Sequence, residues 1–131
     1  MKTLIVEDDF ITSQVMREIL LAFGSADIAE DGKKALELFT ASQSAPEKYD
    51  IIFLDIMMPE MDGQQVLEEI RKIEAKNNVM GLDSVKIIMT TALDDFDNIK
   101  KAFFNQCEGY LVKPVEKNKV IEKLVDMGLI N

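Results

Sequence analysis

The 131-residue sequence predicts a single α/β domain, residues 1–131, in which a parallel β-sheet carries helices on both faces. Short runs that are apolar at consecutive positions recur along the chain, and such runs are typical of strands buried on both sides. Between these runs, apolar residues return every three or four positions, which is the spacing of an amphipathic helix. The alternation of the two patterns favours parallel strands joined by helical crossovers.

Five apolar runs predict five strands. In chain order they are Leu4–Val6, Ala26–Ala29, Ile51–Leu54, Val85–Met89 and Tyr110–Val112. The second run is weaker than the others. Their shortness and near continuity are expected for strands of a covered parallel sheet.

Helical spacing follows each run. Ile11, Val15, Ile19 and Phe23 share the apolar face of a first predicted helix, which ends at Gly24 because glycine is common just after a helix. The remaining helices are predicted around Leu36 and Phe39 after an Asp31–Gly32 turn, and then around Val66–Ile73, Phe96–Phe103 and Val120–Val125.

Five strands alternating with five helices predict an open, doubly wound sheet. The commonest five-stranded version has the strand order 2-1-3-4-5, the flavodoxin-like (βα)5 arrangement. Two polar stretches, Thr40–Lys48 and Ala75–Ser84, are expected to be loops. In such sheets the chemistry gathers beyond the carboxyl ends of the strands, near the point where the strand order reverses.

Composition and charge exclude several classes of function. The chain has 15 basic and 24 acidic residues, a formal net charge of −9, which is the wrong sign for a surface that binds nucleic acid. It has no histidine, which removes imidazole bases, histidine-activated nucleophiles and histidine-bound zinc. The single cysteine, Cys107, cannot form an internal disulfide, and no apolar stretch is long enough to span a membrane. We therefore expect a soluble, cytoplasmic protein without nucleic-acid contact or membrane insertion.

Polar side chains follow four of the predicted strands. They are Glu7, Asp8 and Asp9 after the first strand, Asp55 after the third, Thr90 and Thr91 after the fourth, and Lys113 after the fifth. In the order 2-1-3-4-5 the first and third strands are neighbours at the switch point, so these groups would share one crevice. Close carboxylates repel each other unless a cation lies between them, and Mg²⁺ takes carboxylate oxygens together with a phosphate.

This set of groups predicts a magnesium-dependent phosphoryl-transfer site. Lys113 and Mg²⁺ would neutralise phosphoryl oxygens, and the Thr91 hydroxyl would donate a hydrogen bond to one of them. Because the chain offers no histidine or catalytic cysteine, the nucleophile has to be a carboxylate, and the product would be an aspartyl phosphate.

Four motifs at these strand ends resemble those of bacterial response-regulator receiver domains, the phosphoacceptor modules of two-component signalling. The motifs are Ile5–Asp9, Leu54–Gly63, Thr91–Ala92 and Gly109–Pro114. Their order and their strand-end positions make the resemblance specific, and it extends from Lys2 to about the end of the last predicted helix. The chain resembles stand-alone receivers of the chemotaxis-regulator type, and a receiver excised from a hybrid kinase or a larger regulator is the alternative.

The resemblance implies a set of magnesium ligands. Asp55 would be the phosphorylated residue, and Asp8 and Asp55 would bind Mg²⁺ directly. Glu7 would act through water, and the backbone carbonyl of Met57 would be a further ligand. Asp9 lies one position beyond the acidic pair and is not expected to bind the metal.

The resemblance also implies which residues contact the phosphoryl group and which respond to it. Thr91 and Lys113 would hold the phosphoryl group, and Thr91 and Tyr110 would be the switch residues. A cis peptide bond between Lys113 and Pro114 is expected to aim the lysine ammonium into the crevice.

The leading functional hypothesis is a signalling switch rather than an enzyme. A histidine kinase or a histidine phosphotransfer protein would supply a phosphohistidine, and the acyl phosphate on Asp55 would bias a conformational equilibrium. The change would alter the face formed by the fourth helix, the fifth strand and the fifth helix, and so control a downstream effector protein. The domain would turn over no free substrate.

Other functions and simpler roles fit parts of the sequence. A small aspartyl-phosphate hydrolase of the haloacid-dehalogenase type would carry its nucleophile on the first strand, usually as Asp-x-Asp. A flavodoxin-like FMN carrier would need a hydroxyl- and glycine-rich loop there, where this chain has the acidic Glu7-Asp8-Asp9. Asp55 and Thr91 could instead cap helices, and Tyr110 could be an ordinary packed strand residue.

Overall fold

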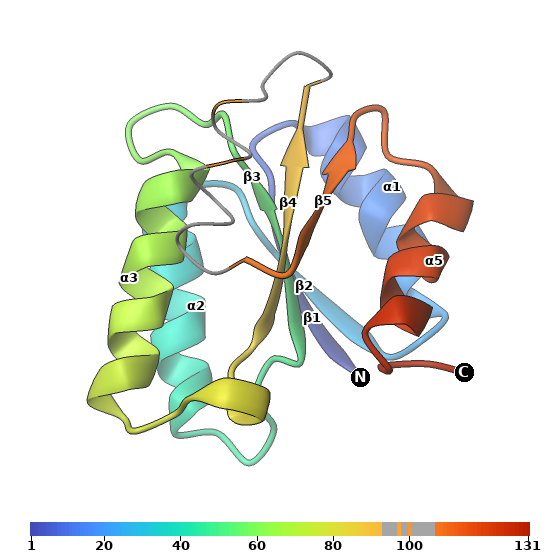
Figure 1. Ribbon diagram of the computed structural model, residues 1–131. Coiled ribbons are helices and arrows are strands. Elements are labelled where there is room, and N and C mark those ends of the chain that lie inside the picture. Colours follow the sequence, from blue (N-terminus) through green and yellow to red (C-terminus); the bar gives the residue numbers. More distant parts are fainter. Residues whose placement is uncertain (93–96, 98–99, 101–106) are drawn as a thin grey trace.

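The computed structural model describes residues 1–92, 97, 100 and 107–131, and these residues include one five-stranded parallel sheet. The strands are β1 (Lys2–Val6), β2 (Ser25–Ala29), β3 (Ile51–Asp55), β4 (Lys86–Thr91) and β5 (Gly109–Val112). Their order is β2-β1-β3-β4-β5, and all neighbouring pairs are parallel (Figure 1), which confirms the predicted topology.

Helices cover both faces of this sheet. They are α1 (Phe10–Leu21), α2 (Gly32–Gln43), α3 (Gly63–Lys76) and α5 (Lys117–Asp126), with a short 3₁₀ helix, η1 (Gly81–Asp83), before β4. The helices α1 and α5 lie on one face, and α2 and α3 lie on the other (Figure 1). The predicted helix Phe96–Phe103 lies outside the described residues apart from residues 97 and 100, which are helical. Within the described part of the chain, no helix is long and apolar enough to cross a membrane.

Successive side chains of a strand point to opposite faces of the sheet. Because helices cover both faces, the central strands are buried on both sides. All five residues of β3 are buried. Ile52 and Leu54 pack with α2 and α3, whereas Ile51 and Phe53 pack with α1 and α5. The sheet thus separates two apolar clusters, which is why its strands are continuously apolar.

The buried face of α1 differs from the predicted one. Met16 and Leu20 are buried, whereas Ile11 is 72% exposed and Val15 is 45% exposed. Both pairs have the spacing of four residues that places side chains on one helix face. The spacing alone does not tell which of two apolar stripes meets the sheet, and the prediction for Ile11 and Val15 is wrong.

Two element boundaries also differ from the prediction. The helix α2 continues to Gln43, so the first part of the predicted loop Thr40–Lys48 is helical. The helix α1 ends at Leu21, and Gly24 lies in the turn that leads to β2. Its φ of +151° and its close approach to the backbone of Met1 leave no room for a Cβ atom.

A close backbone approach fixes the carboxyl end of β3. Gly63 is the first residue of α3, and its N–H donates to the Ile56 carbonyl at 2.9 Å. A Cβ atom on Gly63 would lie 2.3 Å from the carbonyl oxygen of Asp55, so only glycine fits there. The strand end that carries Asp55 is therefore held against the start of α3.

Candidate functional site

Three carboxylates meet at the carboxyl ends of β1 and β3. Glu7 and Asp8 follow β1, and Asp55 is the last residue of β3. One carboxylate oxygen from each residue lies within 4.8 Å of those from the other two. Glu7 and Asp55 are buried, whereas Asp8 is exposed. Because β1 and β3 are neighbours in the sheet, the predicted strand order accounts for this meeting.

The ammonium of Lys113 lies against two of these carboxylates. Its Nζ is 2.8 Å from Glu7 Oε1 and 3.3 Å from Asp55 Oδ2. Burial acts to lower the pKa of Lys113, but the hydrogen bond to Glu7 and the charges of both carboxylates outweigh it and raise this pKa. The peptide bond between Lys113 and Pro114 is cis, as predicted.

The ionisation of Asp55 is unfavourable in this surrounding. Burial and the adjacent Glu7 carboxylate raise the pKa of Asp55 to about 7. The Lys113 ammonium and the N–H of Met57, which donates to Asp55 Oδ1 at 3.2 Å, act in the opposite direction. A further cation beside these carboxylates would lower the pKa of Asp55 and favour its ionised form.

The charge balance and the donor atoms of this cluster fit a divalent cation. Three carboxylates face one ammonium, which leaves an excess of two negative charges. Carboxylate oxygens are ligands that Mg²⁺ prefers, and Mg²⁺ retains several waters, for which the exposed side of Asp8 gives access. Glu7, Asp8 and Asp55 could therefore hold Mg²⁺ from this edge of the sheet.

Asp9 has a different task from its acidic neighbours. Its carboxylate caps α1 by accepting the N–H of Thr12 at 2.9 Å, and it also accepts the hydroxyl of Thr12. The hydrogen bonds from Thr12 lower the pKa of Asp9. In this structure the Asp9 carboxylate thus serves as the N-cap of α1.

Thr91 lies at the end of β4, beside the strand that carries Asp55. It is buried, and its hydroxyl donates to the carbonyl of Ala92 at 3.2 Å. Its own carbonyl accepts the N–H of Lys113 at 2.7 Å, which links the two strand ends. In this structure Thr91 is thus next to the carboxylate cluster, with its hydroxyl engaged elsewhere.

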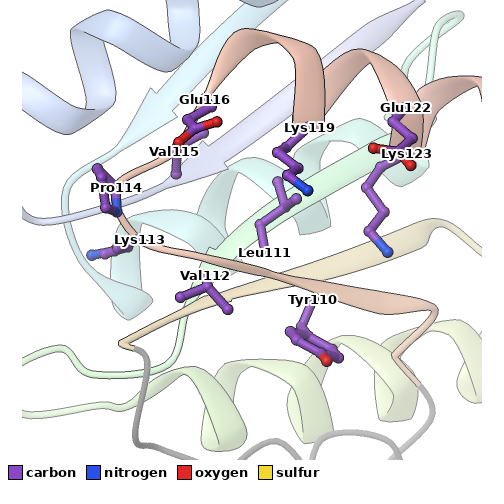
Figure 2. A pocket seen from close by; sticks show the side chains of 10 residues that line it. All are labelled: Tyr110, Leu111, Val112, Lys113, Pro114, Val115, Glu116, Lys119, Glu122 and Lys123. Carbon is purple, nitrogen blue, oxygen red and sulfur yellow. The ribbon is translucent and has the colours of Figure 1, made fainter.

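Tyr110 lies on β5, three residues before Lys113, and is 40% exposed. Figure 2 shows a pocket of about 480 Å³ that Tyr110 lines together with Lys113 and residues of α5. The Nζ of Lys123 is 5.9 Å from the centre of the Tyr110 ring. Tyr110 is therefore outside the carboxylate cluster. It lies on β5, the strand that Lys113 directly follows.

A capping box next to the site was not predicted from the sequence. Asp62 accepts the N–H of Gln65 at 3.0 Å, and the Gln65 side chain accepts the N–H of Asp62 at 2.9 Å. This pair fixes the start of α3 and hence the loop that follows Asp55. The signal was present as an acidic residue followed three positions later by glutamine.

Comparison with known proteins decides the family. The family model of the response regulator receiver domain matches residues 3–125. This chain belongs to the receiver-domain family. The receiver is 31% identical over 128 residues to the chemotaxis protein CheY of Treponema pallidum, an alignment that covers 96% of this chain and 81% of that protein.

Several relatives are much longer than this chain, which matches only a small part of their length. The receiver is 30% identical over 132 residues to a probable histidine kinase 2 of Oryza sativa subsp. indica, covering 93% of this chain but 12% of the kinase. Among solved structures, a chain in the co-crystal of the Saccharomyces cerevisiae histidine phosphotransfer protein Ypd1 and the receiver domain of Ssk1 is 25% identical. That likeness has a TM-score of 0.83 and covers 98% of this chain and 89% of the other.

Proposed function

We propose that this receiver is a phosphoacceptor switch in which Asp55 accepts a phosphoryl group from a phosphohistidine. The observation that carries the proposal is the position of the buried Asp55 carboxylate, 3.3 Å from the Lys113 ammonium and within reach of Glu7 and Asp8. Membership of the receiver family supports the same function. The group of charges resembles what a phosphoryl group and a divalent cation require.

In the proposed reaction, an oxygen of Asp55 attacks the phosphorus of the phosphohistidine in line with the bond that breaks. A P–O bond forms, the P–N bond breaks, and the histidine nitrogen leaves with the electron pair of that bond. Asp55 has to be ionised for this attack, so a cation that lowers its pKa raises the reactive fraction. The product is an acyl phosphate on the protein itself, and no free substrate is turned over.

Asp8 and Asp55 are the proposed direct ligands of Mg²⁺, with the backbone carbonyl of Met57 as a further ligand. Glu7 is proposed to act through water, because its buried carboxylate already holds Lys113 at 2.8 Å. When bound, Mg²⁺ would neutralise charge on the phosphoryl oxygens.

Lys113 and Thr91 are the proposed partners of the phosphoryl oxygens, and Thr91 and Tyr110 are the proposed switch residues. The Thr91 hydroxyl would exchange the carbonyl of Ala92 for a phosphoryl oxygen, since a charged acceptor makes the stronger hydrogen bond. Movement of Tyr110 would then alter the face formed by β5, α5 and the segment between β4 and β5, to which a downstream effector protein binds. The predicted helix in that segment lies outside the described residues.

A histidine kinase or a histidine phosphotransfer protein is the proposed phosphodonor. The similarity to receivers within histidine kinases and to the structure solved with Ypd1 supports this choice. The proposed compartment is the cytoplasm, in which the free thiol of Cys107 persists. The net charge of −9 supports a protein partner rather than nucleic acid, and no membrane insertion is proposed.

Chemical labelling tests the proposal. The chain is incubated with acetyl phosphate and Mg²⁺, the acyl phosphate is trapped by hydride reduction, and the labelled peptide is identified by its mass. We expect label on Asp55 alone, none in Asp55→Asn, and unchanged labelling in the control Asp9→Asn. Label on Asp8 or Asp9, or label that survives Asp55→Asn, would contradict the assignment.

The alternative of a haloacid-dehalogenase-type hydrolase is less well supported. Such an enzyme would need its nucleophile on the first strand, whereas the buried aspartate of this site ends β3 and Glu7 follows β1. We expect no steady turnover of p-nitrophenyl phosphate, and sustained turnover that is lost in Asp8→Asn would favour the hydrolase.

A further inference from the structure

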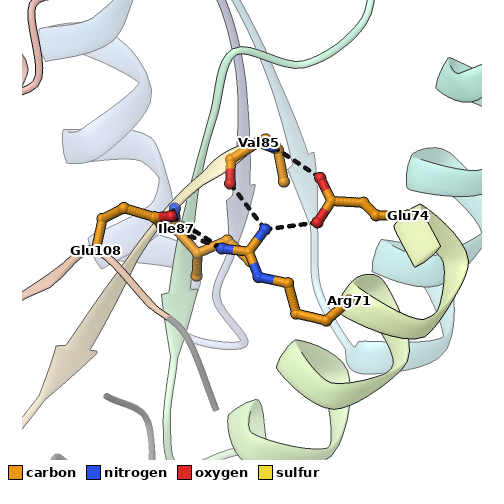
Figure 3. A network of polar contacts seen from close by, with 5 residues as sticks. All are labelled: Arg71, Glu74, Val85, Ile87 and Glu108. Carbon is orange, nitrogen blue, oxygen red and sulfur yellow. Dashed lines mark hydrogen bonds and ion pairs between the residues drawn. The ribbon is translucent and has the colours of Figure 1, made fainter. Parts of the chain in front are cut away.

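A second group of charged side chains lies at the opposite end of β5 from Lys113. Figure 3 shows the guanidinium of Arg71, on α3, between the carboxylates of Glu74 and Glu108. Its Nη1 is 2.6 Å from Glu74 Oε1, and its Nη2 is 3.1 and 3.2 Å from the two oxygens of Glu108. Because Glu108 directly precedes β5, one guanidinium joins α3 to the start of that strand.

Both carboxylates also accept backbone groups at the start of β4. Glu74 accepts the N–H of Val85 at 2.7 Å, and Glu108 accepts the N–H of Ile87. Arg71 donates in turn to the Val85 carbonyl at 3.0 Å. The network therefore ties three segments together, namely α3, the start of β4 and the start of β5.

The strand β5 is the part of the sheet that most needs such a tie. It has four residues, it lies at the edge of the sheet, and in the described part of the chain β4 is the strand it pairs with. Short edge strands fray easily, and their register is weakly fixed. Glu108 lengthens the ladder, because its N–H donates to the Ile87 carbonyl at 2.8 Å while its carboxylate accepts the Ile87 N–H.

We propose that Arg71 and Glu108 form a latch that fixes the start of β5 against α3 and β4 and thereby sets the orientation of Tyr110. Glu108 and Tyr110 are two residues apart in an extended segment, so their side chains point to the same face of the sheet. Leu111 points to the other face, where it packs with α1 and α5. A shift of Glu108 along Ile87 would therefore carry the Tyr110 ring with it.

The low exposure of the network separates it from an ordinary surface ion pair. The side chains of Arg71, Glu74 and Glu108 are 14%, 4% and 29% exposed, whereas those of the Lys72–Glu69 pair on the same helix are 71% and 46% exposed. Exposed ion pairs contribute little to the stability of the fold, while partly buried pairs with several hydrogen bonds contribute more. Lys72 therefore provides a matched control on the same helix.

Hydrogen exchange tests the latch. In Glu108→Ala, Arg71 keeps Glu74 and the Val85 carbonyl, so the core is left paired. We expect the protection of the β5 amides to fall about tenfold, equivalent to about 1.4 kcal/mol, with β2 at the opposite edge unchanged. Lys72→Met should change neither strand. Unchanged protection in β5, or an equal loss in β2 and β5, would overturn the proposal.

Tyrosine emission gives a second readout. The chain has no tryptophan and two tyrosines, so in a Tyr49→Phe background the emission comes from Tyr110 alone. We expect Glu108→Ala to raise the acrylamide quenching constant of Tyr110, and Lys72→Met to leave it unchanged. An unchanged constant in Glu108→Ala would show that the latch does not set the position of the ring.

One consequence rests on the proposed function of Asp55. Since Lys113 directly follows β5, a loosened strand would displace its ammonium from Asp55. Labelling of Asp55 by acetyl phosphate should therefore slow about 3- to 10-fold in Glu108→Ala. This is less than the 10²-fold loss of rate that a misplacement of about 1 Å can cause. Exchange and quenching need no phosphorylation. A wild-type chain that takes no label would therefore contradict the proposed function alone, whereas unchanged β5 protection would contradict the latch.

Discussion

Two clusters of carboxylates lie at opposite ends of the sheet, and each combines buried with exposed members: Glu7 and Asp55 with the exposed Asp8, and Glu74 with the exposed Glu108. The two clusters differ in what separates their charges. At the start of β4 and β5 the guanidinium of Arg71 lies between Glu74 and Glu108, and each carboxylate also accepts a backbone N–H. Charges that leave water need this degree of pairing, because an unpaired buried charge is very costly. The guanidinium and the backbone N–H groups offset much of this charge, although burial still raises the pKa of Glu108. The proposed role of this cluster is to hold segments together.

At the carboxyl ends of the strands the carboxylates adjoin one another instead. Burial and Glu7 raise the pKa of Asp55 to about 7, although the Lys113 ammonium lies 2.8 Å from Glu7 Oε1 and 3.3 Å from Asp55 Oδ2. The exposed Asp8 adds a third carboxylate. The same residue types thus form the proposed latch where a guanidinium and backbone N–H groups pair them, and the proposed phosphoacceptor site where negative charge remains in excess.

The largest expected effect concerns the cluster of Arg71, Glu74 and Glu108. Arg71→Met leaves the buried Glu74 carboxylate without its cation, and we expect a loss of about 3–5 kcal/mol in the free energy of unfolding. Adding Glu74→Gln should recover part of this loss, because the buried charge is then removed. Urea denaturation of the three variants provides the measurement, and a loss below about 1 kcal/mol in Arg71→Met would contradict the comparison.

Removing the cation of the other cluster should affect chemistry more than folding. Lys113→Ala removes an ammonium that faces the proposed phosphoryl group, and we expect labelling of Asp55 by acetyl phosphate to slow about 10²–10³-fold. Lys119→Ala is the control, because Lys119 lines the pocket between β5 and α5. Equal rates in wild type and Lys113→Ala would show that the ammonium does not act on the phosphoryl group.

The difference between the clusters also explains how far the sequence analysis reached. The groups Glu7, Asp8, Asp55 and Lys113 could be brought together from the sequence, because strand order alone decides which strand ends meet. The contact between Arg71 and Glu108 could not be predicted in this way. Arg71 has the sequence context of an ordinary helix residue, and its pairing with Glu108 depends on side chains that are 37 residues apart.

The exposed stripe of α1 was missed for a related reason. Two apolar stripes with the same spacing run along that helix, and tertiary packing decides which of them is buried. Likewise, Thr91 could be placed at a strand end from the sequence, but the bond of its hydroxyl to Ala92 depends on local geometry.

The next expected effect is a gain in the stability of the fold when the charge of Asp55 is removed from the cluster of Glu7, Asp8 and Asp55. The pKa of Asp55 is raised in the folded chain, so its ionisation destabilises the fold as pH rises from about 4 to 7. Asp55→Asn should therefore be more stable than wild type by about 2 kcal/mol at pH 8 without metal, and the difference should vanish near pH 4. Urea denaturation at both pH values checks this, and a less stable variant at pH 8 would show that Asp55 is fully compensated.

The same pKa predicts a pH-dependent affinity for Mg²⁺. Binding requires the ionised carboxylate, so the apparent affinity should fall about tenfold from pH 8 to pH 6 and change little between pH 8 and pH 9. Calorimetric titration gives the affinity at each pH. Equal affinities at pH 6 and pH 8 would place the titrating group outside the metal site.

The smallest expected effect separates the two neighbours Asp8 and Asp9, which differ in their commitments although both carry one carboxylate. The carboxylate of Asp9 holds the N–H and hydroxyl of Thr12 at the start of α1, whereas Asp8 belongs to the three-carboxylate cluster. Asp9→Ala should lower the melting temperature by a few degrees, because a helix cap is lost, and leave Mg²⁺ affinity unchanged. Asp8→Ala should lower the Mg²⁺ affinity, because a proposed direct ligand is removed. It should also raise the melting temperature, because a repulsive charge next to Glu7 disappears. Melting curves without metal and Mg²⁺ titrations of both variants distinguish them, and a loss of affinity in Asp9→Ala equal to that in Asp8→Ala would move the metal site one residue along the chain.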